Sequence, residues 1–403
     1  MNNQNGPLIS VVVTAHNMEG CLKECLESIA GQTFGEFECL VVNDGSTDGT
    51  GAVARAFAAN DSRFAVVDTP GLGAGGARNH GLSWVNAPFF MLLDGDDVFH
   101  PTMFEKLYRA AEASQADLAI CNMQEMDDAT GEFTQVAWAL KRSQLPGGTG
   151  GGKRAGGRGA AGSAFAGAAA GAGGTAGGYI TFGGWREMPG NLFAAFMGWP
   201  WDKLYRTEFI RREGLRFPED LSNSEDGVFV FPTLVCAERI AVVDEVLVDH
   251  RMQRGNTVSS SRVREPYAFY EAICRVKAFL AERGVWEALG QDFLAWAFDW
   301  TLWNIETIGD EAAMRTMAQR LHDGGFPELE LDQHAPSYFT GYPNSMARYT
   351  DLMHTLGENQ QDSGPLGPCR KLPFGKYKPW CFTNRLGRKL KERKLKKAPP
   401  SEW

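Results

Sequence analysis

The sequence lacks any long apolar run. Among its 403 residues, the stretch 228–236 falls short of the roughly 20 apolar residues that a membrane-spanning helix needs, and it contains Pro232. Basic residues are missing ahead of Val11, so the start of the chain does not have the pattern of a secretory signal peptide. We therefore expect a soluble protein of the cytoplasm.

Cysteine motifs are also missing. The 8 cysteines include no Cys-x-x-Cys pair and no cysteine–histidine cluster, which is typical of reduced thiols and not of a disulfide framework or zinc site. Hydrophobic residues make up 43% of the chain and charged residues 22%, so a large core is expected and global disorder is excluded.

Positive charge is scarce except at the C-terminal end. Residues 369–403 contain twelve Lys and Arg against Glu392 and Glu402, a net of +10, so a total of -9 leaves -19 for the other residues. A nucleic-acid-binding domain would carry its positive charge on the folded face, so we expect no nucleic-acid partner. The pattern fits a globular enzyme with a basic tail.

Strand and helix patterns alternate over the first 125 residues. The predicted strands share β-branched and apolar composition and cover residues 8–15, 38–42, 64–68, 89–94 and 117–122. Helices are predicted between them, for example at 19–30 and 47–59. The alternation predicts a parallel α/β sheet with right-handed crossovers, in which ligands bind at the carboxyl ends of the strands.

Two later segments depart from this pattern. Of residues 147–178, 25 of 32 are Gly or Ala, which predicts a disordered insertion, with a flexible lid as the alternative. Residues 265–321 have a helical pattern with a stripe of tryptophans that we expect to be core and not a ligand platform. We predict a domain at 1–258, a helical extension at 259–360 and a basic tail at 361–403.

A glycine motif, Gly71-x-Gly73-x-x-Gly76, is followed by Asp94 and so approaches a dinucleotide-binding fingerprint. Its glycines follow the third predicted strand and not the first, and Gly81 interrupts the helix after them. These departures argue against dinucleotide binding.

The run Asp94-Gly95-Asp96-Asp97 is more specific. Three carboxylates that close a buried strand repel one another unless they are neutralised. A divalent cation, Mn²⁺ or Mg²⁺, that also binds a substrate pyrophosphate would neutralise them. The alternative is a solvated turn ahead of a helix near Pro101.

Several motifs occur in an order that resembles the family 2 glycosyltransferases, enzymes of the GT-A fold that use nucleotide-diphospho-sugars. The matching pieces are Ile9-Ser-Val-Val-Val-Thr-Ala-His-Asn17, Gln32-Thr33-Phe34, Val41-Val-Asn-Asp-Gly-Ser-Thr-Asp48, Ala77-Arg78-Asn79-x-Gly81, Leu93-Asp-Gly-Asp-Asp97, Trp201-x-Lys203-Leu204-Tyr205 and Ser224-Glu225-Asp226. The resemblance covers about residues 8–258 apart from the Gly/Ala-rich segment.

The resemblance implies a GT-A-like α/β fold, with a mixed, mostly parallel sheet flanked by helices and a C-terminal α-helical extension. It implies nucleotide-sugar-binding roles for Thr14, His16, Asn17, Glu19, Asp44, Arg78, Asp94, Asp97 and Arg251. It further implies Asp96 and His250 as ligands of Mn²⁺ or Mg²⁺, and Asp226 beside Glu225 as the catalytic base of an inverting transfer.

Some of these assignments have alternatives. The family usually has Pro-x-Tyr-Asn where this chain has Thr14-Ala15-His16-Asn17, and Asp-Asp-Gly-Ser where it has Asn43-Asp44-Gly45-Ser46, which leaves the choice of nucleotide open. The Glu225-Asp226 pair would have the raised pKa that suits a base, or would be acids favoured by a helix N-terminus. His250 would bind metal or be structural.

The expected reaction moves a sugar from a UDP-sugar to a glycan or lipid-linked acceptor in cell-envelope polysaccharide synthesis. The rivals are a nucleotidyltransferase, which would need a glycine-rich loop after the first strand, and a catalytically silent nucleotide-sugar-binding module. Residues 385–397, which begin with Arg385 and end with Lys397, carry eight positive charges against Glu392. This segment would either dock on the anionic inner face of the membrane, making the protein peripheral there, or be a solvated terminus.

Overall fold

The computed structural model describes residues 6–134, 145–146, 178–188, 192–252, 262, 265–308, 310–325, 328–330 and 334. All of them fall in the first of two units of the chain, residues 1–342. The predicted disordered insertion, apart from its last residue, and the basic tail lie outside the described residues. The domain boundary predicted at 258 also lies outside them and stays a prediction.

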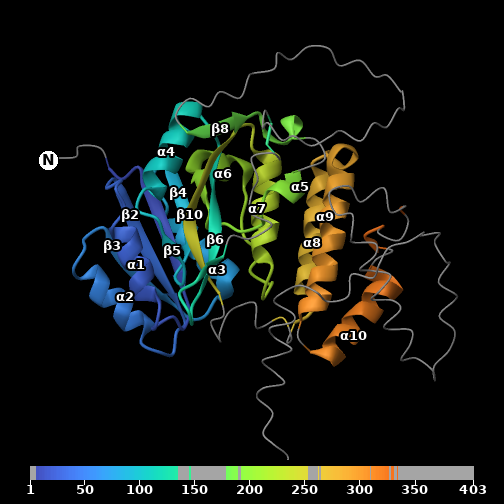
Figure 1. Ribbon diagram of the computed structural model, residues 1–403, viewed down its shortest axis with the longest axis horizontal. Helices are drawn as coiled ribbons and strands as arrows, with labels where there is room; N and C mark the ends of the chain where they lie inside the picture. The colour runs from blue at the N-terminus through green and yellow to red at the C-terminus, as the bar shows by residue number, and fades with distance from the viewer. Residues whose placement is uncertain are drawn as a thin grey trace, which may run out of the picture. The chain divides into compact units, whose positions relative to one another are not determined.

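A mixed sheet forms the centre of the described chain (Figure 1). Its strands follow the order β3-β2-β1-β4-β9-β6-β10-β5, with β7 paired to β6 and β8 to β10. The bounds are β1 Ile9–Ala15, β2 Phe37–Asp44, β3 Phe64–Thr69, β4 Phe89–Asp94, β5 Val98–Phe99, β6 Leu118–Asp127, β7 Phe133–Thr134, β8 Tyr179–Phe182, β9 Lys203–Arg206 and β10 Ile240–Met252.

The five strands predicted near the start of the chain are confirmed as β1, β2, β3, β4 and β6. Strands β1 to β4 pair in parallel, as do β6 and β10. β9 lies between β4 and β6 and runs antiparallel to both, so the five predicted strands share one direction within a mixed sheet. The mixed sheet that the family resemblance implied is the one observed.

Helices cover both faces of the sheet. They are α1 Leu22–Ala30, α2 Thr50–Ala58, α3 Gly73–Trp84, α4 Met103–Ser114, α5 Leu192–Ala195, α6 Thr207–Glu213 and α7 Glu225–Cys236. Alternate residues of β1, such as Val11 and Val13, share one core with α1, α2 and α4. Val12 points to the other face, where α3 approaches β1 at Gly81. The period-2 pattern of β1 therefore serves two helical layers.

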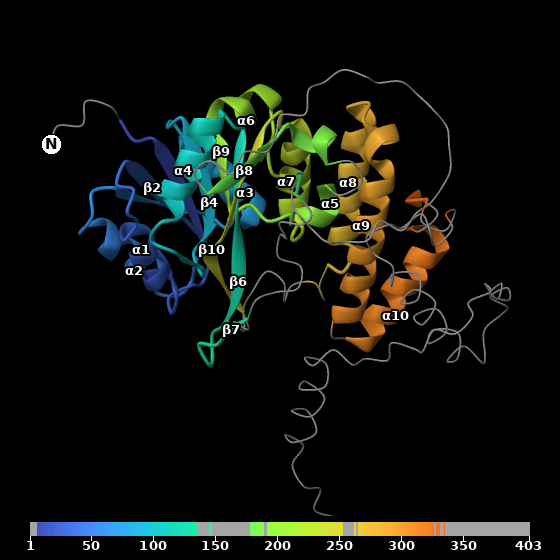
Figure 2. The ribbon, with the colours of Figure 1, turned by 45° about the horizontal axis from the view of Figure 1, so that its top comes forward.

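The predicted helical extension is present as α8 Ala268–Glu282, α9 Trp286–Thr307, α10 Glu311–Arg320 and a π-helical turn at Leu321–Gly325. In Figures 1 and 2, α7 lies between the sheet and the α8–α9 pair. In the tryptophan stripe, Trp296 is half-buried and packs against Phe231, with ring centroids 4.5 Å apart. The prediction fails at Trp303, which is 40% exposed.

Within the described part of the chain, no helix is both long and apolar enough to cross a membrane.

Candidate active site

The loops after β1 and β2 are tied together by side chains that the sequence marked for nucleotide binding. His16 Nδ1 lies 2.6 Å from the carbonyl oxygen of Asp44. Asn17, whose φ is 52°, accepts a hydrogen bond from Thr47 N at 2.8 Å. Glu19 accepts one from Gly49 N at 3.0 Å. These three residues therefore build the shape of the loops, and their predicted contacts with a nucleotide stay predictions.

Asp44 organises the loop between β3 and α3. Its Oδ1 accepts hydrogen bonds from Thr69 Oγ1 at 2.6 Å and from Leu72 N at 2.7 Å, and its Oδ2 accepts one from Gly73 N at 2.9 Å. Gly71 and Gly73 have φ values of 90° and 77°, a conformation that glycine adopts without strain. Backbone conformation, and not a dinucleotide phosphate, therefore accounts for these two glycines of the motif.

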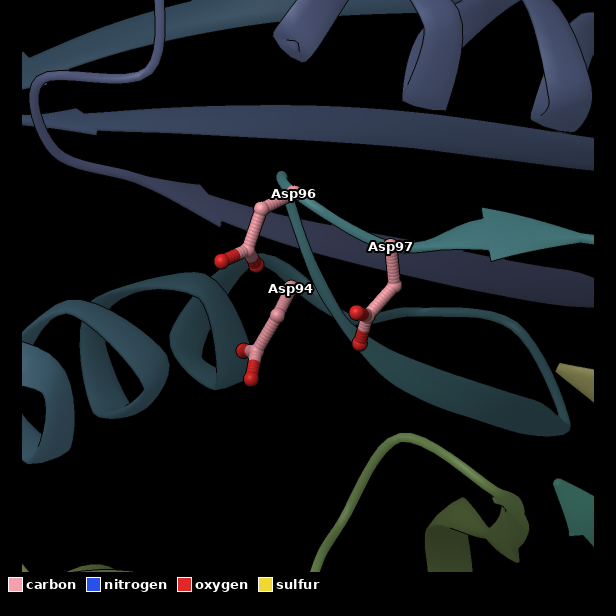
Figure 3. Close-up of side chains that lie close together, drawn as sticks. All are labelled: Asp94, Asp96 and Asp97. Carbon is pink, nitrogen blue, oxygen red and sulfur yellow. The ribbon is translucent and has the colours of Figure 1, made fainter. Parts of the chain in front are cut away.

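The acidic turn after β4 brings three carboxylates together (Figure 3). Asp94, Asp96 and Asp97 each offer an oxygen, and these atoms lie within 4.8 Å of one another. The turn packs tightly against β1, because a Cβ on Gly95 would lie 3.0 Å from the carbonyl oxygen of Thr14. Thr14 also places its hydroxyl 3.4 Å from Asp94 Oδ1.

Asp97 is the buried member of the three, with 0% of its surface exposed. Its Oδ1 accepts hydrogen bonds from His250 Nδ1 at 2.9 Å and from Arg251 N at 3.0 Å. Among the described residues, no partner reaches its buried Oδ2. A buried carboxylate oxygen without a donor is costly, and a divalent cation would satisfy it. The donor set therefore fits Mn²⁺ or Mg²⁺ with Asp97 among the ligands. The contact with a sugar nucleotide that the resemblance implied for Asp97 stays a prediction.

His250 is held beside Asp97 by stacking on Trp201 and Trp199, with ring centroids 5.0 and 5.8 Å away. Burial alone lowers the pKa of His250, but Asp97 and the two other aspartates more than reverse this and raise it to about 9. These charges favour the protonated ring, which offsets part of the negative charge of the acidic turn. A metal-ligand role would require the ring to lose that proton.

Arg251, predicted to contact a phosphate, is already committed within the chain. Its Nε donates to the carbonyl oxygen of Asp96 at 2.8 Å, its Nη2 donates to Glu24 at 2.5 Å, and its Nη1 pairs with Asp128. All three guanidinium nitrogens thus have partners, so Arg251 braces the acidic turn in this structure.

Arg78 connects the acidic turn to the start of α7. From α3 its Nη2 donates to Asp94 Oδ1 at 2.9 Å and its Nη1 to Glu225 Oε1 at 2.7 Å. Asp226 Oδ1 lies 2.8 Å from the same Nη1, outside the angle of a hydrogen bond. Burial lowers the pKa of Arg78, but the three carboxylates outweigh this and raise it well above its usual value.

The two acids of α7 differ in their surroundings. The Glu225 side chain is 4% exposed and hydrogen-bonded, whereas 20% of the Asp226 side chain is exposed. Burial, followed by the charges of Glu225 and Asp94, raises the pKa of Asp226 well above its usual range, although Arg78 and Lys203 act against this. The predicted pair is therefore brought to the site, and Asp226 has the higher proton affinity that a base needs.

Comparison with known proteins supports the resemblance found in the sequence. Residues 10–166 match the family model described as glycosyl transferase family 2. This match confirms the resemblance of that segment to the family 2 glycosyltransferases. The chain is 27% identical over 246 residues to the uncharacterized glycosyltransferase EpsJ of Bacillus subtilis, covering 61% of each chain. It is 28% identical over 255 residues to the putative glycosyltransferase EpsH of the same organism, covering 62% of this chain and 63% of EpsH. The chain thus spans about three fifths of these relatives.

A solved structure agrees on the fold of this chain. Residues 1–349 of S. aureus TarS, crystallised in complex with UDP-GlcNAc, superpose with a TM-score of 0.59 at 21% identity, covering 87% of this chain and 90% of that one. At this identity the likeness shows the fold alone. It confirms the GT-A-like architecture with a helical region after the sheet.

The sequence analysis assigned no role to Lys203, which helps to build the candidate site. Lys203 is fully buried and donates to the carbonyl oxygens of Trp199 and Met197 at 2.7 and 3.2 Å, and to Asp202 at 2.5 Å. It thereby holds the loop whose two tryptophans stack on His250. The Trp201-x-Lys203 motif was a visible signal, but the partners of a buried lysine are set by tertiary contacts.

Proposed function

We propose that the protein transfers a sugar from a nucleotide-diphospho-sugar, with a UDP-sugar as the expected donor, to a glycan or lipid-linked acceptor in cell-envelope polysaccharide synthesis. The observation that carries this proposal is the link through Arg78. One guanidinium joins Asp94 of the acidic turn to Glu225 and Asp226 of α7. Arg78 therefore contacts both the acids that would face the leaving diphosphate and the candidate base.

The donor side consists of Asp94, Asp96 and Asp97, which would hold Mn²⁺ or Mg²⁺. When bound, such a cation neutralises charge that develops on a leaving diphosphate. The orphaned oxygen of Asp97 and the excess of carboxylates over cations support this assignment. Arg251 keeps the turn in shape through the carbonyl oxygen of Asp96.

The acceptor side depends on Asp226. In the proposed step, the acceptor hydroxyl gives its proton to the Asp226 carboxylate while its oxygen attacks the anomeric carbon. The bond from that carbon to the diphosphate oxygen breaks, and the electron pair leaves with the diphosphate. A single displacement inverts the anomeric centre. Glu225 is less suited to this role because it already accepts a hydrogen bond from Arg78.

Two alternatives fit less well. A nucleotidyltransferase would use a glycine-rich loop after β1, and residues 15–17 contain none. A silent binding module would need no base with a raised pKa, yet Asp226 has one. The match to glycosyl transferase family 2 also favours sugar transfer.

The basic segment 385–397 lies outside the described residues, and its docking on an anionic membrane is a further part of the proposal. Its eight positive charges would each contribute roughly 1 kcal/mol near such a surface. Attachment of this kind would keep the enzyme at the surface that carries a lipid-linked acceptor.

The test combines donor binding with turnover. A panel of UDP- and GDP-sugars is screened by thermal shift with and without Mn²⁺, and nucleotide release is then measured with the donors that bind. Asp226→Asn should bind donor like the wild type but transfer about 10²–10⁴-fold more slowly, the usual contribution of a general base. Asp220→Asn, whose side chain is 67% exposed on the surface, serves as the matched control.

Each outcome has a clear meaning. Loss of donor binding in Asp226→Asn would make Asp226 a ligand or a structural residue. Binding without turnover in the wild type for every donor and acceptor tried would favour the silent module.

A further inference from the structure

The two terminal nitrogens of Arg78 bind acids from two different elements of the site. The residue is 4% exposed, and it lies in the middle of α3. Nη2 donates to Asp94, at the end of β4, and Nη1 to Glu225, in the first turn of α7. Its Nε is also buried, with no hydrogen-bond partner among the described residues. This guanidinium thus points at acids on both sides and not toward open solvent.

The neighbouring residue already holds the backbone ahead of α7. Asn79 Nδ2 donates to the carbonyl oxygen of Phe217 at 2.9 Å, and Phe217 N donates back to Asn79 Oδ1 at 3.1 Å. A Cβ on Gly75 would lie 2.2 Å from the carbonyl oxygen of Pro218, so α3 and this loop are in close contact. The backbone of this segment is thus held by Asn79 and by its contact with Gly75, while the Arg78 guanidinium lies over the Phe217 ring, 5.4 Å from its centroid.

A guanidinium is a rigid planar fork, so the positions of two acids bound to its two ends are not independent. Here the fork sets the position of Asp94 relative to Glu225. Because Glu225 takes the hydrogen bond of Nη1, Asp226 Oδ1 stays 2.8 Å from the positive charge without being bonded to it. The carboxylate is thereby held in place while its lone pairs remain available.

We propose that Arg78 is a positioning residue for sugar transfer, which fixes the donor-side Asp94 and the base Asp226 relative to each other without touching the nucleotide. The proposal rests on the proposed function. It differs from the nucleotide-binding role that the family resemblance implied, because both terminal nitrogens are occupied by acids of the chain. Its consequence is that Arg78 acts on the rate of transfer and not on donor affinity.

Arg78→Lys tests this role because lysine keeps the charge but has a single nitrogen, which cannot bridge Asp94 and Glu225. A displacement of about 1 Å in a reacting group can cost roughly 10²-fold, so we expect a fall in kcat of about 10–10²-fold. The Kd for UDP with Mn²⁺, measured by calorimetry, should stay within about 3-fold of the wild type. Arg109→Lys is the control, because Arg109 is exposed and pairs with Glu105 away from the site.

Glu225→Gln and the double variant complete the experiment. Glu225→Gln removes the acceptor charge from the other end of the fork and should lower kcat by a similar factor. If the two residues act as one unit, the double variant is no slower than the slower single variant, because effects within one unit are not additive.

Several results would overturn the proposal. A tenfold or larger rise in the Kd for UDP, with kcat kept at saturating donor, would mean that Arg78 binds the nucleotide. If the fall in kcat of the double variant equals the product of the two single falls, Arg78 and Glu225 have independent roles. Full kcat in Glu225→Gln would refute the fork even if Arg78→Lys did not fold. A wild type that binds UDP and releases none from any donor would instead refute the proposed function, and this role with it.

Discussion

Gly81 lies where α3 is pressed against the central strand of the sheet. A Cβ added there would lie 2.2 Å from Cγ1 of Val12, 3.1 Å from its Cγ2 and 3.2 Å from its Cβ. Two carbon atoms prefer a separation of about 3.5–4.0 Å. Val12 is fully buried within β1, between β2 and β4, so it has no free space to move into.

The expected cost of Gly81→Ala follows from two opposing effects. Overpacking a core by one methyl group costs about 1–3 kcal/mol, whereas alanine in a helix interior is favoured over glycine by about 1 kcal/mol. Because the overlap exceeds 1 Å and its partner is fixed, we expect a net loss of about 1–2 kcal/mol in the free energy of unfolding. Arg78, one turn earlier in α3, would move with the helix, so turnover should fall as well.

The assay is urea unfolding of Gly81→Ala, Val12→Ala and the double variant. Val12→Ala removes both methyl groups that the new Cβ would meet, so the double variant should lose less stability than the sum of the two single changes. Gly290→Ala is the matched control, because its Cβ would meet only the ring of the partly exposed Trp286, at 3.1–3.4 Å. A Gly81→Ala protein as stable as the wild type, with additive effects in the double variant, would refute the reasoning.

Three further outcomes are expected. Asp96→Ala should abolish the thermal stabilisation that Mn²⁺ with UDP confers while the protein stays folded. An equal rise in Tm in the wild type and in Asp96→Ala would show that Asp96 does not bind the metal. Burial raises the pKa of Asp292 to about 6, against the hydrogen bond from Phe193 N, so its neutral form stabilises the fold below pH 4 and that contribution is lost as the pH rises through 6. Asp292→Asn should therefore gain stability relative to wild type between pH 4 and 8, by about 3 kcal/mol at most, and a difference that is constant with pH in urea unfolding would contradict this. The full chain should sediment with anionic but not neutral liposomes, and less so at high salt, while a chain ending at Lys378 should not; equal sedimentation of both would leave only a solvated terminus.

The sequence by itself determined the local elements and the chemistry at their ends. The apolar run of β1 and the acids after β4 predicted strands buried up to the point where a ligand would bind. These features depend on residues close together in the chain, so their pattern is visible without a structure. The ordered motifs also implied the family, because each preserves a backbone turn or a carboxylate at a fixed place along the chain.

Only the tertiary structure decided how those pieces are joined. β9 has four residues, too few for a pattern that would place it between β4 and β6, and its position follows from pairing with strands distant in sequence. Arg78 and Arg251 looked alike as candidate ligand contacts, yet one bridges the two sides of the site and the other braces the acidic turn. Which acid a buried arginine pairs with depends on neighbours brought together only by folding, since an unpaired charge in the interior is too costly to remain.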